Sequence, residues 1–165
     1  MIADVVLEDE RWEGLDLGAL AERAAAAALA ELDLPVKGFS FALLACDDAR
    51  IKELNSEFRE KDKPTNVLSW PSEERSADEP GGDLWLPEPG EEDDPEELGD
   101  IAMAYETCAR EAEEAGRPMA DHVTHLVIHA LLHLMGYDHI DDADAALMEG
   151  IEIRALARLG IADPY

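Results

Sequence analysis

The sequence is poor in aromatic residues, in cysteine and in positive charge. Tryptophan, tyrosine and phenylalanine together make up 5% of the 165 residues, so a core must be built mainly from Leu, Ile, Val and Ala. Hydrophobic residues of all kinds reach 47%, which excludes a wholly disordered chain. The length suits one domain, and we expect residues 1–165 to form it.

Long apolar runs are also missing. The longest, residues 24–30, is far shorter than the roughly 18 residues that a membrane helix requires. The first ten residues, MIADVVLEDE, are acidic and lack the positive segment that opens a signal peptide. We interpret the two cysteines, Cys46 and Cys108, as buried free thiols in a reducing compartment. These features favour a cytoplasmic protein that does not bind membranes.

Positive charge is scarce, with 13 Lys and Arg against 40 Asp and Glu and a net charge of −27. Taken alone, this balance argues against nucleic acid, because phosphate binding normally needs a basic surface. Residues 72–97 hold twelve acidic residues and one basic residue, Arg75, and so carry −11 of the total. The remainder is still acidic. An RNA site would therefore be a local patch, or would rely on a metal ion and on partners.

The acidic segment 72–97 is also rich in proline and glycine and shows no periodicity. Long segments of this kind in a compact domain are usually surface insertions. We expect such an insertion here, with the small apolar island at residues 84–86 holding its middle against the body of the protein.

The rest of the chain alternates between short apolar runs and segments with helical periodicity. We predict strands at residues 2–7, 39–45, 66–70 and 98–104. Helices are predicted at residues 17–32, from Asp47 to before Lys61, and at 105–115, 120–135 and 143–159. Four strands and about five helices, without internal repeats, indicate an α+β domain.

All five histidines lie within eighteen residues, and three of them have the spacing of metal ligands. His129 and His133 are four residues apart and project from one helical face. Gly136 can take the positive φ that ends a helix and turns the chain, which would bring His139 back over that face. Three imidazoles with a fourth position left for water are typical of catalytic zinc sites. We predict one Zn²⁺ held by His129, His133 and His139 at the end of the helix over 120–135.

His122 and His125 lie near the same face but further back along the helix. At 1.5 Å per residue, His125 stands about 12 Å from His133 along the axis, too far to share a metal ion with it. We expect both residues to pack in the core or to form hydrogen bonds behind the ligands.

The spacing His-x₃-His-x₂-Gly-x₂-His equals that of the metzincin proteases. Those enzymes need a glutamate directly after the first histidine as general base, and Ala130 occupies that position here. A methyl group cannot accept a proton. The metal geometry is therefore expected to serve a different chemistry, although a metalloprotease-like hydrolase stays an alternative.

The run HALLHLMGYDH at residues 129–139 resembles the histidine motif of the YbeY family of bacterial rRNA maturation factors. Two further blocks, from Asn55 to Pro71 and from Leu98 to Ile101, resemble family segments in the same order, and His125-Leu126 resembles the residues before the metal helix. The departures from the usual family pattern are Ala130, Asn66 and Trp70, in place of Gly, Asp and Phe. None of them removes a predicted ligand.

The resemblance implies a mixed four-stranded sheet and a zinc-dependent, single-strand-specific endoribonuclease. It implies work on the 3′ end of small-subunit rRNA and in ribosome quality control, with small ribosomal subunits and assembly factors as partners. It assigns phosphate binding to Arg59, whose planar fork suits that role. Arg59 and the ligand His133 are accordingly the predicted catalytic residues. A non-catalytic assembly factor, in which the metal only braces the fold, is a further alternative.

No general base stands out in the sequence. A zinc-bound water with its pKa lowered to about 7 could attack the phosphodiester, as could an activated 2′-hydroxyl. Asp138 adjoins a predicted ligand, but it could serve only to fix the turn. Tyr137 could pack against the protein or orient a ligand.

Overall fold

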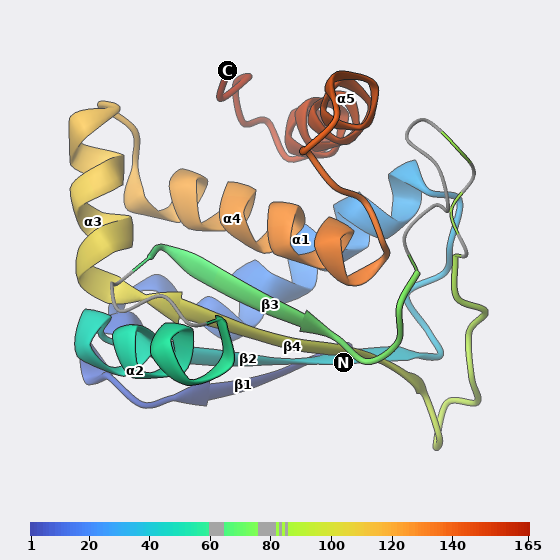
Figure 1. Cartoon of the computed structure of the whole chain (residues 1–165), viewed down its shortest axis with the longest axis horizontal. Helices are drawn as coiled ribbons and strands as arrows, with labels where there is room; N and C mark the ends of the chain where they lie inside the picture. Colours follow the sequence, from blue (N-terminus) through green and yellow to red (C-terminus); the bar gives the residue numbers. More distant parts are fainter. Residues whose placement is uncertain (60–64, 76–81, 83, 85) are drawn as a thin grey trace.

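Four strands and five α-helices make up the described part of the chain in the computed structural model (Figure 1). That part is residues 1–59, 65–75, 82, 84 and 86–165, without the side chains of Phe58 and Arg59. The strands are β1 (Ala3–Leu7), β2 (Phe39–Cys46), β3 (Val67–Pro71) and β4 (Glu96–Ala104). The helices are α1 (Leu17–Glu31), α2 (Asp48–Arg59), α3 (Tyr105–Glu114), α4 (Met119–Leu134) and α5 (Asp142–Arg158). None of these helices combines the length and the hydropathy that a bilayer crossing requires.

The strands form one mixed sheet in the order β1-β2-β4-β3. β1, β2 and β4 run parallel, with Val5 beside Leu43 and Leu43 beside Ile101. β3 runs antiparallel to β4, with Ser69 opposite Ile101, and forms one edge of the sheet. The α+β class and the mixed four-stranded sheet are therefore confirmed.

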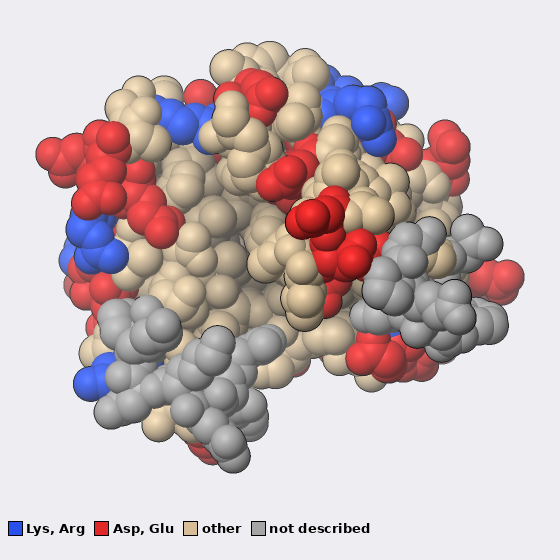
Figure 2. Space-filling view, turned by 45° about the horizontal axis from the view of Figure 1, so that its top comes forward, with Lys and Arg blue, Asp and Glu red and all other residues tan. Residues whose placement is uncertain are grey.

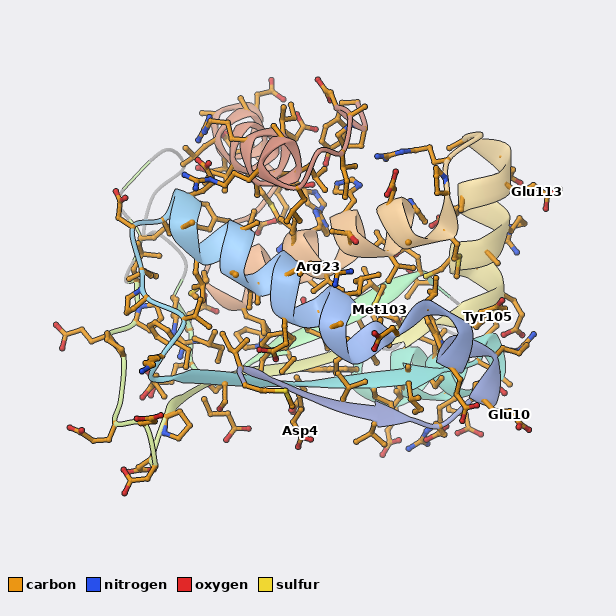
Figure 3. The ribbon with its side chains drawn as sticks, turned by 180° about the vertical axis from the view of Figure 1, so that it is seen from behind. Asp4, Glu10, Arg23, Met103, Tyr105 and Glu113 are labelled. Carbon is orange, nitrogen blue, oxygen red and sulfur yellow. The ribbon has the colours of Figure 1, made fainter. Side chains whose placement is uncertain are left out.

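One face of the sheet carries the main helical layer. α1 and α4 lie across this face, and α5 packs on both of them on the side away from the sheet (Figure 1). Alternate residues of the central strands, such as Leu43, Ile101 and Met103, are buried against this layer. Seen from behind, α1 crosses the sheet and Asp4 of β1 points away from the helices (Figure 3). The predicted ligand helix is thus held in the middle of the molecule by apolar packing.

The opposite face has a smaller apolar cluster under α2. Ile51 and Leu54 of this helix are buried with the other set of alternating strand residues, including Cys46, Ala102 and Ala104. Both sides of β2 and β4 are therefore apolar, which explains why residues 39–45 are hydrophobic apart from Ser40.

The structure differs from the sequence-based expectations in two places. A short 3₁₀ helix, Glu10–Leu15, precedes α1, and the fully buried Trp12 on it donates a hydrogen bond from Nε1 to the carbonyl of Cys46. β4 begins at Glu96, so the predicted acidic insertion at residues 72–97 ends two residues earlier, at Pro95; residues 76–81, 83 and 85 of this segment lie outside the described residues. Its one basic residue, Arg75, is not on the surface, because its side chain is 3% exposed and donates to the carbonyls of Leu98 and Leu134.

Both cysteines are buried and free, as predicted. Burial raises the pKa of the Cys46 thiol to about 12 and raises that of Cys108 as well. At pH 8 we expect neither thiol to react with Ellman's reagent in the native protein, whereas both should react at once in guanidinium chloride. Rapid labelling of one thiol under native conditions would contradict the buried positions.

Candidate metal centre

Helix α4 places His129 and His133 side by side. Its apolar residues, among them Ile128, Leu131 and Leu132, are fully buried and fix the rotation of the helix about its axis. The two histidines consequently share the opposite, partly exposed face, one turn apart. Their Nε2 atoms lie 3.1 Å apart, and their ring centroids are separated by 4.6 Å.

The turn after α4 returns the third histidine to the same place. Gly136 has a φ of +105°, and its N–H donates to the carbonyl of His133. Three residues beyond Gly136, the backbone N–H of His139 donates to Oδ1 of Asp138, so Asp138 holds the turn. The ring of His139 then lies 5.4 Å from that of His129 and 5.1 Å from that of His133. One ring nitrogen from each of the three histidines lies within 4.8 Å of the others.

The outer ring nitrogens of the two helical histidines are both engaged. Nδ1 of His133 lies 2.9 Å from the carbonyl of Tyr137, which can only accept, so Nδ1 carries the proton and donates. Nδ1 of His129 lies 3.2 Å from Oε2 of Glu152 on helix α5. In both residues the lone pair is thereby left on Nε2, the atom that faces the cluster.

The electrostatics keep these groups in the states that bind cations. Burial, together with the neighbouring imidazoles of His129 and His139, lowers the pKa of His133 to about 4. Burial alone would raise the pKa of Glu152, but hydrogen bonds from His125, His129 and Tyr165 outweigh it and bring the pKa to about 2. At neutral pH the centre therefore contains a neutral His133 and an ionised carboxylate, as metal binding requires.

The donor set and the spacing of the two helical histidines suit a tetrahedral zinc ion. Zn–N bonds of about 2.0–2.1 Å place two ligand nitrogens about 3.3 Å apart along a tetrahedral edge. The separation of 3.1 Å between the Nε2 atoms of His129 and His133 is close to that edge. Three nitrogen donors and no thiolate also suit zinc better than a hard cation such as Mg²⁺.

The histidines open onto a cavity of about 680 Å³. One wall comes from the edge strand β3 and the residues before it, and the other from the end of α4 and its turn, including Ala130, Tyr137 and Ile140. Among the described lining residues Arg75 is the sole Lys or Arg, and its guanidinium is taken up by backbone carbonyls. Figure 2 shows the basic side chains toward the margins of the view, whereas uncharged residues and some acidic side chains lie nearer its centre.

The remaining candidate residues have mixed outcomes. His125 bonds Glu152 at 2.5 Å, and Glu152 contacts His129, so His125 forms the expected hydrogen bond behind a ligand. His122 bonds Glu111 of α3 at 3.0 Å instead. Arg59 is the last residue of α2, but its side chain lies outside the described part of the structure. Its assignment to phosphate binding therefore stays a prediction.

Sequence analysis missed Glu152 and Tyr165. Glu152 is fully buried between α5 and α4, and the hydroxyl of Tyr165 donates to its Oε1 at 2.7 Å. A signal for Glu152 was present, because it has helical spacing with the apolar residues Met148 and Leu156 on the buried face of α5. A carboxylate at such a position needs partners to offset its desolvation. The sequence around Tyr165 carries no comparable signal.

Together, fold and site define a class: a one-domain α+β protein with three histidines converging beside a cavity at the end of a central helix. The chain belongs to the YbeY family, because the family model described as Endoribonuclease YbeY matches residues 7–160.

Similar proteins cover almost the whole chain. A protein of Cereibacter sphaeroides is 61% identical over 99% of this chain and 98% of its own length. Proteins of Dinoroseobacter shibae and Ruegeria pomeroyi are 58% and 57% identical, over 98% and 100% of this chain and 89% and 98% of their own lengths. All three carry the name Endoribonuclease YbeY. A solution structure from Thermotoga maritima has the same fold, with a TM-score of 0.57 and 21% identity over 96% of this chain and 92% of that one.

The turn at Gly136 can be tested by Gly136→Ala. A side chain at this positive φ is strained, and its Cβ would stand 2.4 Å from the carbonyl oxygen of Arg75. We expect a loss of at least about 2 kcal/mol of unfolding free energy, measured by urea denaturation. Gly18→Ala in α1 is the matched control, since its Cβ meets nothing within 4 Å. Equal midpoints for the two variants would refute the steric role of the turn.

Proposed function

We propose that this protein is a zinc-dependent endoribonuclease that cleaves single-stranded RNA. The observation that carries the proposal is the convergence of His129, His133 and His139. The relatives that match this chain over nearly their full length are named endoribonucleases. We further propose that it matures the 3′ end of small-subunit rRNA and serves in ribosome quality control. It would act in the cytoplasm with small ribosomal subunits and assembly factors as partners.

The histidines would hold Zn²⁺ through one nitrogen each. When bound, the ion supplies a Lewis acid that lowers the pKa of a coordinated water to about 7 and polarises a phosphoryl oxygen. The carbonyl of Tyr137 and the carboxylate of Glu152 keep the rings of His133 and His129 oriented for this task. The cavity beside the histidines offers the space in which a phosphodiester would lie.

Arg59 would bind the phosphate of the substrate. The guanidinium of Arg75 is occupied by the carbonyls of Leu98 and Leu134, which leaves the described cavity wall without an available Lys or Arg side chain. A chain of net charge −27 needs such a group to attract RNA. We propose that all 165 residues belong to one catalytic domain, in which the acidic segment 72–95 is a surface insertion.

A protease function has less support. Ala130 occupies the position of the metzincin glutamate, and it is fully buried beside the ligands at the cavity wall. Asp138, the carboxylate adjoining His139, already accepts the hydrogen bond that holds the turn. The cavity therefore lacks, at the position where metzincins carry it, the base that peptide hydrolysis requires.

Metal dependence separates the proposed function from its alternatives. Chelation should abolish cleavage of single-stranded RNA, and one equivalent of zinc should restore it, while unfolded casein stays intact throughout. His133→Ala should lose more than about 100-fold in rate, because it removes one of three ligands. Cleavage of casein would favour the protease. Binding to small ribosomal subunits without either cleavage would favour a non-catalytic assembly factor.

The role of Arg59 has a separate test. Arg59→Ala should lower kcat/KM for RNA by about 10²–10³-fold, the usual effect of removing one group that stabilises transition-state charge. Zinc content should stay at one ion per chain. The control is Arg23→Ala, which removes an exposed arginine from α1 (Figure 3). Wild-type rates in Arg59→Ala, with activity lost in His133→Ala, would rule out phosphate binding by Arg59.

A further inference from the structure

The carboxylate of Glu152 is buried, which is unusual for a charged side chain. Its residue is fully buried on α5, on the face where Ile151, Ala155 and Leu156 pack into the core. Removing a carboxylate from water costs several kcal/mol unless close partners offset that cost. If the only role of this position were to pack α5 against the core, an apolar residue would suit it equally well.

All the partners shown for Glu152 are neutral hydrogen-bond donors or histidines. Oε1 accepts from the hydroxyl of Tyr165 at 2.7 Å and lies 2.5 Å from Nε2 of His125. Oε2 lies 3.2 Å from Nδ1 of His129. The ion pairs that the structure shows for Glu152 are those with the two histidines. A negative charge is therefore held behind the cluster without a lysine or arginine in these contacts to neutralise it.

This contact orients one of the candidate ligands. Nδ1 of His129 donates to Glu152, so the lone pair on Nε2 is directed at the cluster, 3.1 Å from Nε2 of His133. His133 has only the neutral carbonyl of Tyr137 in the corresponding position. A carboxylate behind a ligating imidazole raises the basicity of the ligand and adds charge that attracts a cation.

Tyr165 and His125 bind the oxygen that does not face His129. Their rings also pack edge to face, with centroids 5.5 Å apart. Two contacts on Oε1 fix the rotation of the carboxylate, so that Oε2 stays aimed at His129. The segment after α5 is thereby connected to a ligand on α4 through a single side chain.

We infer that Glu152 is a positioning residue that sets the affinity of the histidine centre for Zn²⁺, and that Tyr165 holds Glu152 in the required orientation. This inference rests on the proposed function, because it takes His129, His133 and His139 as the metal ligands. It concerns how tightly the metal is held and needs no assumption about the substrate.

The test measures zinc affinity in the full chain by competition with a chromophoric chelator. Glu152→Gln keeps the shape of the side chain but removes its charge, and we expect zinc to bind about 10–100-fold more weakly. Glu149→Gln removes the same charge from the same helix without touching the histidines, and we expect a change of less than about twofold. Wild-type affinity in Glu152→Gln, or equal losses in the two variants, would overturn the inference.

Tyr165→Phe makes the test independent of the buried charge. It keeps the carboxylate but removes one hydrogen bond, so we expect a several-fold loss of zinc affinity together with a changed visible spectrum of the Co²⁺-substituted protein. This variant decides the matter if Glu152→Gln fails to fold, and wild-type affinity and spectrum would then refute the role of Tyr165 and Glu152.

Failure of the proposed function gives a different result. If the wild-type protein binds no zinc, or if His133→Ala binds zinc as tightly as the wild type, then the three histidines are not the metal site. If zinc binds through the histidines but Glu152→Gln does not weaken it, then only the further inference is wrong.

Discussion

The convergence of the three imidazoles depends on the backbone at Gly136. Its positive φ lets the chain leave α4 and return within three residues, so that His139 lies over the face that carries His129 and His133. A side chain at this position would collide with the backbone of Arg75. The guanidinium of Arg75 in turn donates to the carbonyl of Leu134 at the end of α4 and to that of Leu98 in β4. The turn, the start of the acidic segment and the sheet are therefore fitted to one another at the edge of the cavity.

Charge is distributed in the molecule in a way that suits a cation better than an anion. The chain carries a net charge of −27, and the charged residue closest behind the histidines, Glu152, is a fully buried carboxylate. Hydrogen bonds from His125, His129 and Tyr165 stabilise this carboxylate, but none of these partners carries a permanent positive charge. A divalent cation among the histidines would supply that charge. The proposed zinc ion would therefore complement the buried carboxylate and would place positive charge beside the cavity.

Most of the secondary structure could be predicted because it depends on local patterns. The helix that carries the ligands shows strict apolar periodicity, and Gly116, Pro118 and Gly136 mark its surroundings. The short 3₁₀ helix around Trp12 was not predicted, since its two turns are too short to leave a periodic pattern. The start of β4 at Glu96 was also missed, because pairing with β2 extends the strand into residues whose composition suggests a loop.

The three histidines, their spacing and the glycine that brings them together can all be read from the primary structure. These features lie within eleven consecutive residues, where helix geometry and one turn decide which side chains meet. The groups behind the ligands, in contrast, become apparent only in the folded chain. Glu152 lies 23 residues from His129, and Tyr165 lies 40 residues from His125. Such contacts arise from the packing of α5 on α4, and no local spacing in the chain specifies them.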